Sequence, residues 1–408
     1  MTTEKLDPAI EQLNALVSSV TALLTQLEAT LTELTKETEP LMTVEETSKF
    51  YSSFDSKPAV PGFDCLKAAS GSAALIKAHT TKLSLLIITE PFTPTAISKV
   101  LRELVSGAVP SLATAAEFCR PAGYTFIFSQ AFRLKCHSLL RELRTFVQKI
   151  PADGKVLSEE QRQTATDGTG KGSLPMTGVL WSICDDLARF ADAGVGSFFV
   201  NRIEETRLTL KDIVDELTEW QEESDNRDDD DDDDNDGEDS DGGAADSDSA
   251  VGLDDSLQTL NASTNAQALL DDLMNSAKLI PRDDTQKIRP RLRECLRSLK
   301  LTMLMCQAVS KRRLKTLPPF PVQNYKIPMT LQKVFRHLGI LPQKYEDVVM
   351  AFYELDPTSI DKNLSDAISD VVGVIAELKQ PWAGSPSDGF SSWYDKFRDE
   401  LQSVGKNY

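Results

Sequence analysis

The sequence of 408 residues lacks the features that mark a membrane or secreted protein. It contains no run of about 18 apolar residues, which a helix needs to cross a bilayer. Its opening, MTTEKLDPAIEQL, has neither the basic region nor the apolar stretch of a secretory signal. We therefore expect a soluble protein of the cell interior that does not associate with a membrane.

Metal and disulfide signatures are also missing. The six cysteines are scattered, and no two of them form a C-x-x-C pair. Reduced thiols in an apolar core are therefore favoured over a disulfide framework or a zinc site. The cysteines that fall on apolar helical stripes are Cys136, Cys184, Cys295 and Cys306.

No arrangement of residues points to catalysis. The three histidines, His79, His137 and His337, lie in separate segments without a second ligand at metal-binding spacing. The stretch DGTGKGS resembles a phosphate-binding loop, but glycine follows its lysine where serine or threonine is required. We therefore predict no catalytic residue, no metal and no cofactor, and hence no enzyme.

Acidic charge is concentrated in one short stretch. Between Glu222 and Asp255 there are eighteen acidic residues and a single basic one, Arg227, so this stretch carries −17 of the net charge of −19. So dense a run of like charge cannot bury enough apolar surface to offset the entropy of ordering its backbone. We predict an acidic disordered linker over residues 223–255.

The linker also matches part of a calcium-binding loop. Asp232, Asp234, Asp236 and Gly237 fit the first positions of a helix–loop–helix calcium site. The closing position, which requires glutamate, is occupied by Gly243. A solvated linker is therefore favoured over a calcium site.

Apolar residues elsewhere recur with helical spacing. Residues 7–37 carry a heptad seam of two apolar positions, and Asp7 with Pro8 supplies a helix start. Residues 288–314 carry the stripe Leu292, Leu296, Leu299 and Met303. No convincing alternating strand pattern occurs, so the fold class is predicted to be all-α.

The linker divides the predicted fold into two up-and-down helical bundles. The first spans residues 1–222, with about five to six helices and a long heptad-patterned first helix. The second spans residues 256–408, with about four helices, and a further short helix is predicted near its start, over 266–273.

Basic residues gather on the helix that follows the linker. KRRLK at its end is typical of a nuclear-import signal or a nucleic-acid contact, but cations in a last helical turn also complement the helix dipole. Both interpretations stay open at this point. The candidate partner or import surface comprises Arg289, Arg293, Arg297, Lys300, Lys311, Arg312 and Arg313.

The order of helical segments resembles the cyclin-D-binding protein family, also called cyclin-D-interacting or GCIP-like proteins. The resemblance rests on GVLWSICDDLARF, on NRIEETRLTLKDIVDELTEWQEE before the acidic stretch, and on RPRLRECLRSLKLTMLMC after it. SIDKNLSDAISDVVGVIAEL and SSWYDKFRDEL continue the same order, so that most of residues 60–404 is covered.

The resemblance implies a non-enzymatic interaction protein of the cytoplasm and nucleus, which binds a D-type cyclin or a helix–loop–helix regulator. It implies protein partners, without direct contact to nucleic acid. A cytoskeletal adaptor of the vinculin or α-catenin kind is the alternative, because such adaptors are also built from bundles of long helices.

Overall fold

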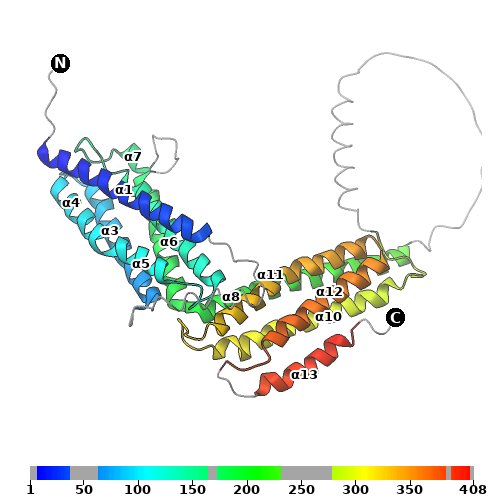
Figure 1. Cartoon of the computed structure of the whole chain (residues 1–408). Coiled ribbons are helices and arrows are strands. Elements are labelled where there is room, and N and C mark those ends of the chain that lie inside the picture. Colours follow the sequence, from blue (N-terminus) through cyan, green and yellow to red (C-terminus); the bar gives the residue numbers. More distant parts are fainter. Residues whose placement is uncertain (1–6, 37–62, 164–171, 231–277, 383–386, 405–408) are drawn as a thin grey trace, which may run out of the picture. The chain divides into compact units, whose positions relative to one another are not determined.

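A computed structural model describes residues 7–36, 63–163, 172–230, 278–382 and 387–404. All regular elements in these ranges are helices, which confirms the all-α prediction (Figure 1). None of these helices is long and apolar enough to cross a membrane. The chain divides into two compact units: unit 1 comprises Met1–Asn201 with Thr316–Lys333, and unit 2 comprises Arg202–Lys315 with Val334–Tyr408.

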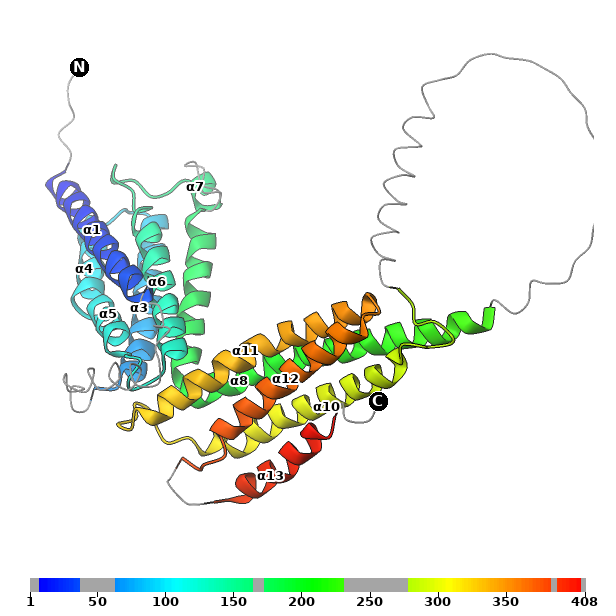
Figure 2. The same ribbon diagram turned by 45° about the vertical axis from the view of Figure 1, so that its right-hand side comes forward.

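Unit 1 is a bundle in which helix α1 packs on α6 and α4, while α3 packs on α5. Figure 2 shows α1, α3, α5 and α6 running alongside one another. The elements of unit 1 are α1 (Pro8–Lys36), α3 (Cys65–Ile88), α4 (Pro94–Glu103), the π-helix η1 (Leu104–Ala108), α5 (Val109–Phe118), α6 (Phe126–Val147), α7 (Glu159–Gln163) and the first part of α8 (Ser173–Asp230).

The heptad seam predicted for the first helix is the face that α1 buries. Leu13, Val20, Leu24 and Leu31 are at most 2% exposed, in agreement with the predicted stripe. Next to this stripe, the Glu28 carboxylate accepts a hydrogen bond of 2.7 Å from the Arg144 guanidinium of α6. Apolar burial therefore holds α1 on α6, and one partly buried ion pair sets its position.

Aromatic side chains of α6 and α8 form the centre of unit 1. The Phe128 ring stacks on Phe190 at 5.1 Å between centroids and meets Phe198 edge-on at 5.3 Å. Phe132 and Phe199 extend the cluster. Such offset and edge-on contacts add to the burial of apolar area, so this cluster fixes how α8 lies against α6.

Helix α8 is broken at Gly194. The backbone there has φ 70° and ψ −175°, a conformation that is essentially restricted to glycine. Gly194 is therefore the point at which two helical segments join within α8.

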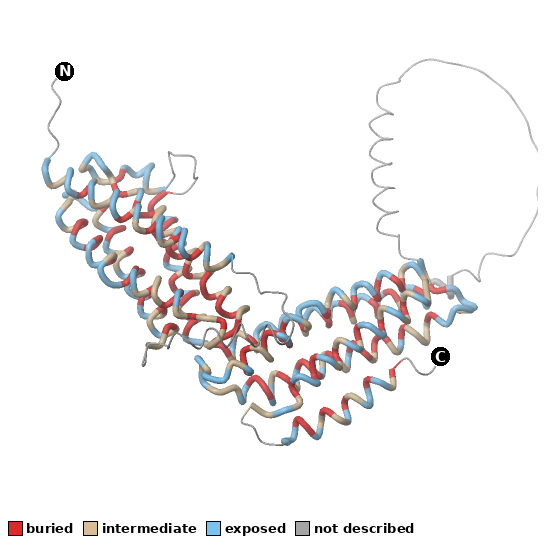
Figure 3. Tube along the Cα trace, in the orientation of Figure 1, coloured by how far each residue is buried: buried red, intermediate tan, exposed pale blue. Residues whose placement is uncertain are grey.

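Unit 2 is built around the second part of α8 together with α10, α11 and α12, which lie side by side in Figures 1 and 2. Buried positions, red in Figure 3, follow the sides on which these helices face one another. The elements are α10 (Ile288–Arg312), η2 (Leu314–Thr316, whose last residue belongs to unit 1), α11 (Lys326–Tyr353, of which unit 2 takes the part from Val334), α12 (Pro357–Glu377) and α13 (Gly389–Gln402).

The core of unit 2 combines apolar stripes with one satisfied polar cluster. Leu217 of α8, Leu299 of α10 and Phe352 of α11 are fully buried in it. The buried Tyr345 hydroxyl lies 2.7 Å from Ser298 Oγ and 2.9 Å from Thr302 Oγ1. Because these hydroxyls partner one another, the buried Tyr345 phenol has its hydrogen bonds satisfied.

The predicted limits around the linker need correction. Helix α8 continues past residue 223 to Asp230, because Ser224 is buried and its Oγ accepts a hydrogen bond of 3.3 Å from the Ile280 amide. The predicted limit at 222 thus falls inside unit 2. The rest of the predicted linker, residues 231–255, and the predicted helix over 266–273 lie outside the described residues.

The predicted second bundle also loses a segment to unit 1. Residues 316–333 belong to unit 1, although they follow α10 in the chain. The Val322 amide donates to the Gly123 carbonyl at 3.0 Å, and the Phe320 ring stacks on Tyr124 at 6.3 Å. The prolines at positions 318, 319 and 321 disfavour a continuous helix there, but nothing in the sequence indicates which unit the segment joins.

Adjacent residues of α10 test the assignment of its buried face. Leu299 is fully buried in the unit 2 core, whereas Lys300 is exposed. We expect Leu299→Asp to lower the free energy of unfolding by ~3 kcal/mol or more, because a carboxylate would be buried without a partner. Lys300→Asp should change it by about 0.5 kcal/mol or less. Urea unfolding followed by circular dichroism measures both, and equal losses would contradict the assigned face.

Candidate interaction surfaces

All seven basic residues predicted as a partner surface lie on α10 or directly after it, but they do not form one surface. Two are engaged at the sides of the helix. The Arg289 guanidinium donates to Asp225 of α8 at 3.1 Å. Arg297 pairs with Glu400 of α13 at 2.5 Å and also lies 3.5 Å from Glu294. These two cations hold α10 to its neighbours in unit 2.

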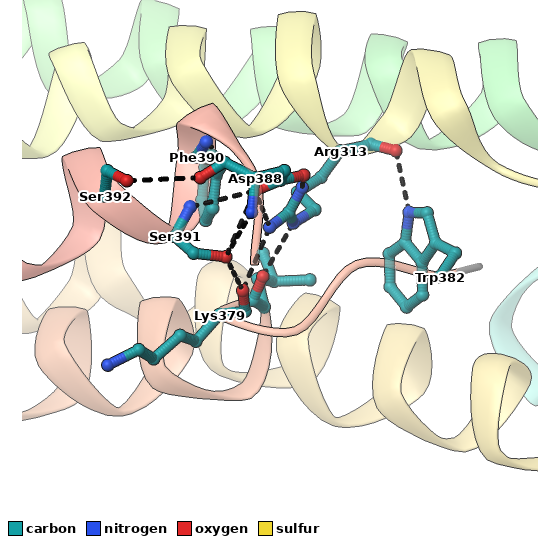
Figure 4. A network of polar contacts seen from close by, with 8 residues as sticks. Arg313, Lys379, Trp382, Asp388, Phe390, Ser391 and Ser392 are labelled. Atoms are coloured by element: carbon teal, nitrogen blue, oxygen red, sulfur yellow. Dashed lines mark hydrogen bonds and ion pairs between the residues drawn. The ribbon is translucent and has the colours of Figure 1, made fainter. Parts of the chain in front are cut away.

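Arg313 is the clearest correction to the predicted surface, because its side chain is 1% exposed. Its guanidinium makes a bidentate ion pair with Asp388 and donates to the carbonyl oxygens of Leu378 and Lys379 at 2.7 and 3.0 Å (Figure 4). It also lies over the Phe390 ring, 4.2 Å from the centroid. A planar fork of five donors suits this set of acceptors, so Arg313 has a structural role.

Asp388 joins this cluster to the start of α13. Its carboxylate accepts from the backbone amides of Phe390 and Ser391 at 3.0 and 2.9 Å and thereby caps the helix. The Arg313 guanidinium holds the pKa of the Asp388 carboxyl far below its usual range, with the Ser391 amide adding to the effect. One ion pair therefore joins the ends of α10, α12 and α13.

The remaining cations are exposed. Arg293, Lys300 and Lys311 form no ion pair within the described part of the chain, and they lie on the same side of α10 as the half-exposed Leu304. The KRRLK run is not presented as a continuous basic segment, because Arg313 and Leu314 are buried between exposed cations. Arg312, at the last position of α10, is exposed.

An apolar surface that the sequence reasoning missed lies on unit 1. Three large side chains point to solvent there: Leu85 of α3 is 56% exposed, and Leu174 and Trp181 of α8 are 42% and 39% exposed. Ala74 and Ala78 of α3 and Gly178 of α8 are exposed beside them. We call the set the α3–α8 strip: Ala74, Ala78, Leu85, Leu174, Gly178 and Trp181.

Three contacts show that the two halves of the strip are neighbours. Lys77 pairs with Asp185 at 2.7 Å, the Trp181 indole donates to Thr81 Oγ1 at 3.0 Å, and Thr177 donates to Ser84 Oγ at 3.0 Å. The residue numbers rise on α3 as they fall on α8, so these helices run antiparallel.

The helical period then places Leu85, Leu174 and Trp181 on the outer edge of that contact. One feature of the sequence could have indicated this surface. Leu85 is apolar, yet it does not lie on the helical face formed by Ala69, Ala73, Ile76 and Leu83. Contiguous exposed apolar patches are typical of interaction sites, so the strip is a candidate contact surface.

The histidines occupy three separate places. His79 Nδ1 lies 3.9 Å from Glu103 Oε2, and burial lowers the pKa of this imidazole. His137 Nε2 lies 3.2 Å from Thr32 Oγ1, and His337 Nδ1 lies 4.0 Å from Asp370. In the ranges that the structure covers, no cluster of His, Cys, Asp and Glu could hold a metal ion.

Taken together, these features define an all-helical protein whose distinctive surfaces are an apolar strip and a row of cations. Residues 69–223 match the family model described as "Grap2 and cyclin-D-interacting, N-terminal". This match confirms, for residues 69–223, the resemblance predicted from the sequence. The match runs from the first turns of α3 into the second part of α8, so it includes the whole α3–α8 strip. A comparison with curated proteins gives no match.

The Arg313–Asp388 pair gives a prediction with a pH dependence. Asp388→Asn leaves a buried guanidinium without its counter-ion, so we expect a loss of ~2–3 kcal/mol in the free energy of unfolding at pH 7, which allows for solvent screening of the partly exposed carboxylate. Because the pKa of the Asp388 carboxyl is lower in the folded than in the unfolded protein, the ion pair stabilises the fold at pH values above the unfolded pKa of about 3.9. The difference between the two proteins should narrow as the pH falls below that value.

Asp356 is a matched control, since it caps α12 through the Thr358 and Ser359 amides in the way Asp388 caps α13. Asp356→Asn should cost only a few tenths of a kcal/mol, because asparagine caps helices about as well as aspartate. Urea unfolding at pH 7, 4 and 3 measures both variants. A loss for Asp388→Asn no larger than that of Asp356→Asn would show that the ion pair does not stabilise unit 2.

Proposed function

We propose that this protein is a non-enzymatic interaction module that binds a D-type cyclin or a helix–loop–helix regulator in the cytoplasm and nucleus. The observation that carries the proposal is the α3–α8 strip, which lies inside the segment matching a family named for its cyclin-D interaction. An amphipathic helix of a partner would cover such a strip with its own apolar face.

Several features support the strip as the contact. Trp181 offers a large apolar surface with a single polar atom, and that atom is already paired with Thr81. Tryptophan anchors of this kind contribute strongly to protein interfaces. Adding a Cβ atom at Gly178 would meet no other atom within 4 Å, so the surface above this residue is open to a partner.

The cations of α10 have a secondary place in this proposal. Arg293, Lys300 and Lys311 would favour an acidic partner surface and speed its encounter, whereas exposed charge pairs add little affinity. The apolar strip is therefore the part of the proposal on which binding should depend most.

Binding of a purified D-type cyclin to the full chain, measured by calorimetry, tests the proposal. Leu85→Glu should weaken binding at least tenfold, because a charge would be buried at the centre of the contact. Leu208→Glu is the matched control: Leu208 is a 48% exposed leucine on the second part of α8, in unit 2. It should leave the affinity unchanged.

Gly178→Gln separates binding from folding. The side chain has room and raises helix propensity, so the variant should be at least as stable as the wild type, by up to ~0.8 kcal/mol, yet bind more weakly. Equal affinity in all four proteins would refute the strip as the contact. Binding to actin, with none to a cyclin or a helix–loop–helix protein, would favour the cytoskeletal alternative.

A further inference from the structure

Three exposed cations of α10 form a row on one side of the helix. Arg293, Lys300 and Lys311 are separated by seven and eleven residues, and both intervals are close to whole helical turns. Leu304, which is 48% exposed, lies on the same side. We call this set of four residues, Arg293, Lys300, Leu304 and Lys311, the α10 cation face.

The carboxylates that approach α10 from neighbouring helices pair with other cations. Asp225 of α8 pairs with Arg289, and Glu400 of α13 pairs with Arg297. Within the described part of the chain, the three cations of the α10 cation face have no carboxylate at ion-pair distance. A row of like charges without counter-ions attracts a polyanion from elsewhere.

The same chain carries such a polyanion. Residues 231–277 contain fourteen acidic side chains and no basic one, and twelve of the fourteen fall within residues 231–255. We call residues 231–255 the acidic segment. Residues 287–315, by contrast, contain ten basic side chains and one acidic one. The charge of the acidic segment therefore complements that of α10.

Both ends of the stretch that contains the acidic segment are fixed beside the start of α10. On the side of α8, Asp225 pairs with Arg289 in the first turn of α10 at 3.1 Å. On the returning side, the Ile280 amide donates to Ser224 Oγ at 3.3 Å. The 47 residues of 231–277 therefore leave and return at the same end of the helix.

This stretch is long enough to follow α10 to its other end. The 25 residues of α10 make a helix about 38 Å long. The 25 residues of the acidic segment span at most about 80 Å when fully extended. The segment can therefore reach Lys311 at the far end of α10, and the 22 residues that follow it can span the way back.

We propose that the acidic segment docks on the α10 cation face of its own chain and competes there with other polyanions. Each exposed charge contact is weak by itself. Covalent linkage gives the segment a high effective concentration at the face, so several weak contacts form together. A partner with an acidic surface must then displace the segment before it can bind. The inference does not depend on the α3–α8 strip.

Zero-length cross-linking of the full chain tests the contact, because a carbodiimide joins a lysine amine to a carboxylate only where the two touch. Mixing equal amounts of unlabelled and 15N-labelled protein shows by mass spectrometry which cross-links form within one chain. We expect cross-links within one chain from Lys300 or Lys311 to the acidic segment. Their yield should fall in ~1 M salt, where the Debye length is about 3 Å.

Lys362 of α12 is the matched control, since it is an exposed lysine of the same unit. Its neighbour Asp361 pairs with Arg291 near the start of α10, where the stretch leaves and returns, whereas Lys311 lies at the opposite end. A segment that does not dock would cross-link Lys362 at least as often as Lys311. Equal yields at these two lysines, or no cross-link to Lys300 or Lys311, would overturn the proposal. Cross-links found only between a labelled and an unlabelled chain would also overturn it, because a second copy would then occupy the face.

Heparin affinity at low salt separates docking from an effect of net charge. The test variant neutralises four carboxylates of the acidic segment: Asp231→Asn, Asp232→Asn, Asp233→Asn and Asp234→Asn. We expect it to bind heparin at least about threefold more tightly than the wild type, because the cations of the face become accessible. Adding Lys300→Gln and Lys311→Gln to both proteins should remove most of this gain. A gain of the same size in both backgrounds would show that net charge alone is responsible and that the segment does not dock on α10.

Discussion

Burial of apolar helical stripes is the interaction on which this structure depends. Each helix satisfies its own backbone hydrogen bonds, so the fold is decided by which side of each helix is removed from water. At ~25 cal/mol per Å² of buried apolar area, residues such as Leu13 in unit 1 and Leu299 in unit 2 contribute far more than the exposed ion pairs around them. Single exposed apolar side chains are normal, but a group of them on two neighbouring helices, as in the α3–α8 strip, calls for a different explanation.

Stripes alone do not specify how helix ends are held. In unit 2 this task falls to Arg313, whose buried guanidinium meets Asp388 and the last carbonyl oxygens of α12. Removing one partner of a buried ion pair costs more free energy than forming the pair gains. The Arg313–Asp388 pair therefore acts mainly by selecting one arrangement of the ends of α10, α12 and α13. The other cations of α10 also differ in whether they pair with a neighbouring helix. Arg289 and Arg297 pair with acidic side chains of neighbouring helices, whereas Lys300 is exposed.

Local physics made much of the fold predictable from the sequence. The heptad seam identified the buried face of α1, and the stripe through Leu292 and Leu299 identified that of α10, because both follow from a period of 3.6 residues. Side-chain partners from distant segments could not be predicted in this way. Nothing in the run KRRLK distinguishes the buried Arg313 from the exposed Lys311, since the difference comes from Asp388, far along the chain. The exposed Trp181 was missed for the same reason: it fits a helical pattern, and only its neighbours show which side faces water.

The most direct measurement of the central claim is hydrogen–deuterium exchange on the full chain, alone and with a bound D-type cyclin. The account predicts slower exchange in the peptides that cover Leu85 of α3 and Trp181 of α8, because a partner helix bound to the strip would shield α3 and α8. Exchange along α10 should stay unchanged. Protection confined to unit 2, with α3 and the first part of α8 unaffected by the bound cyclin, would contradict it.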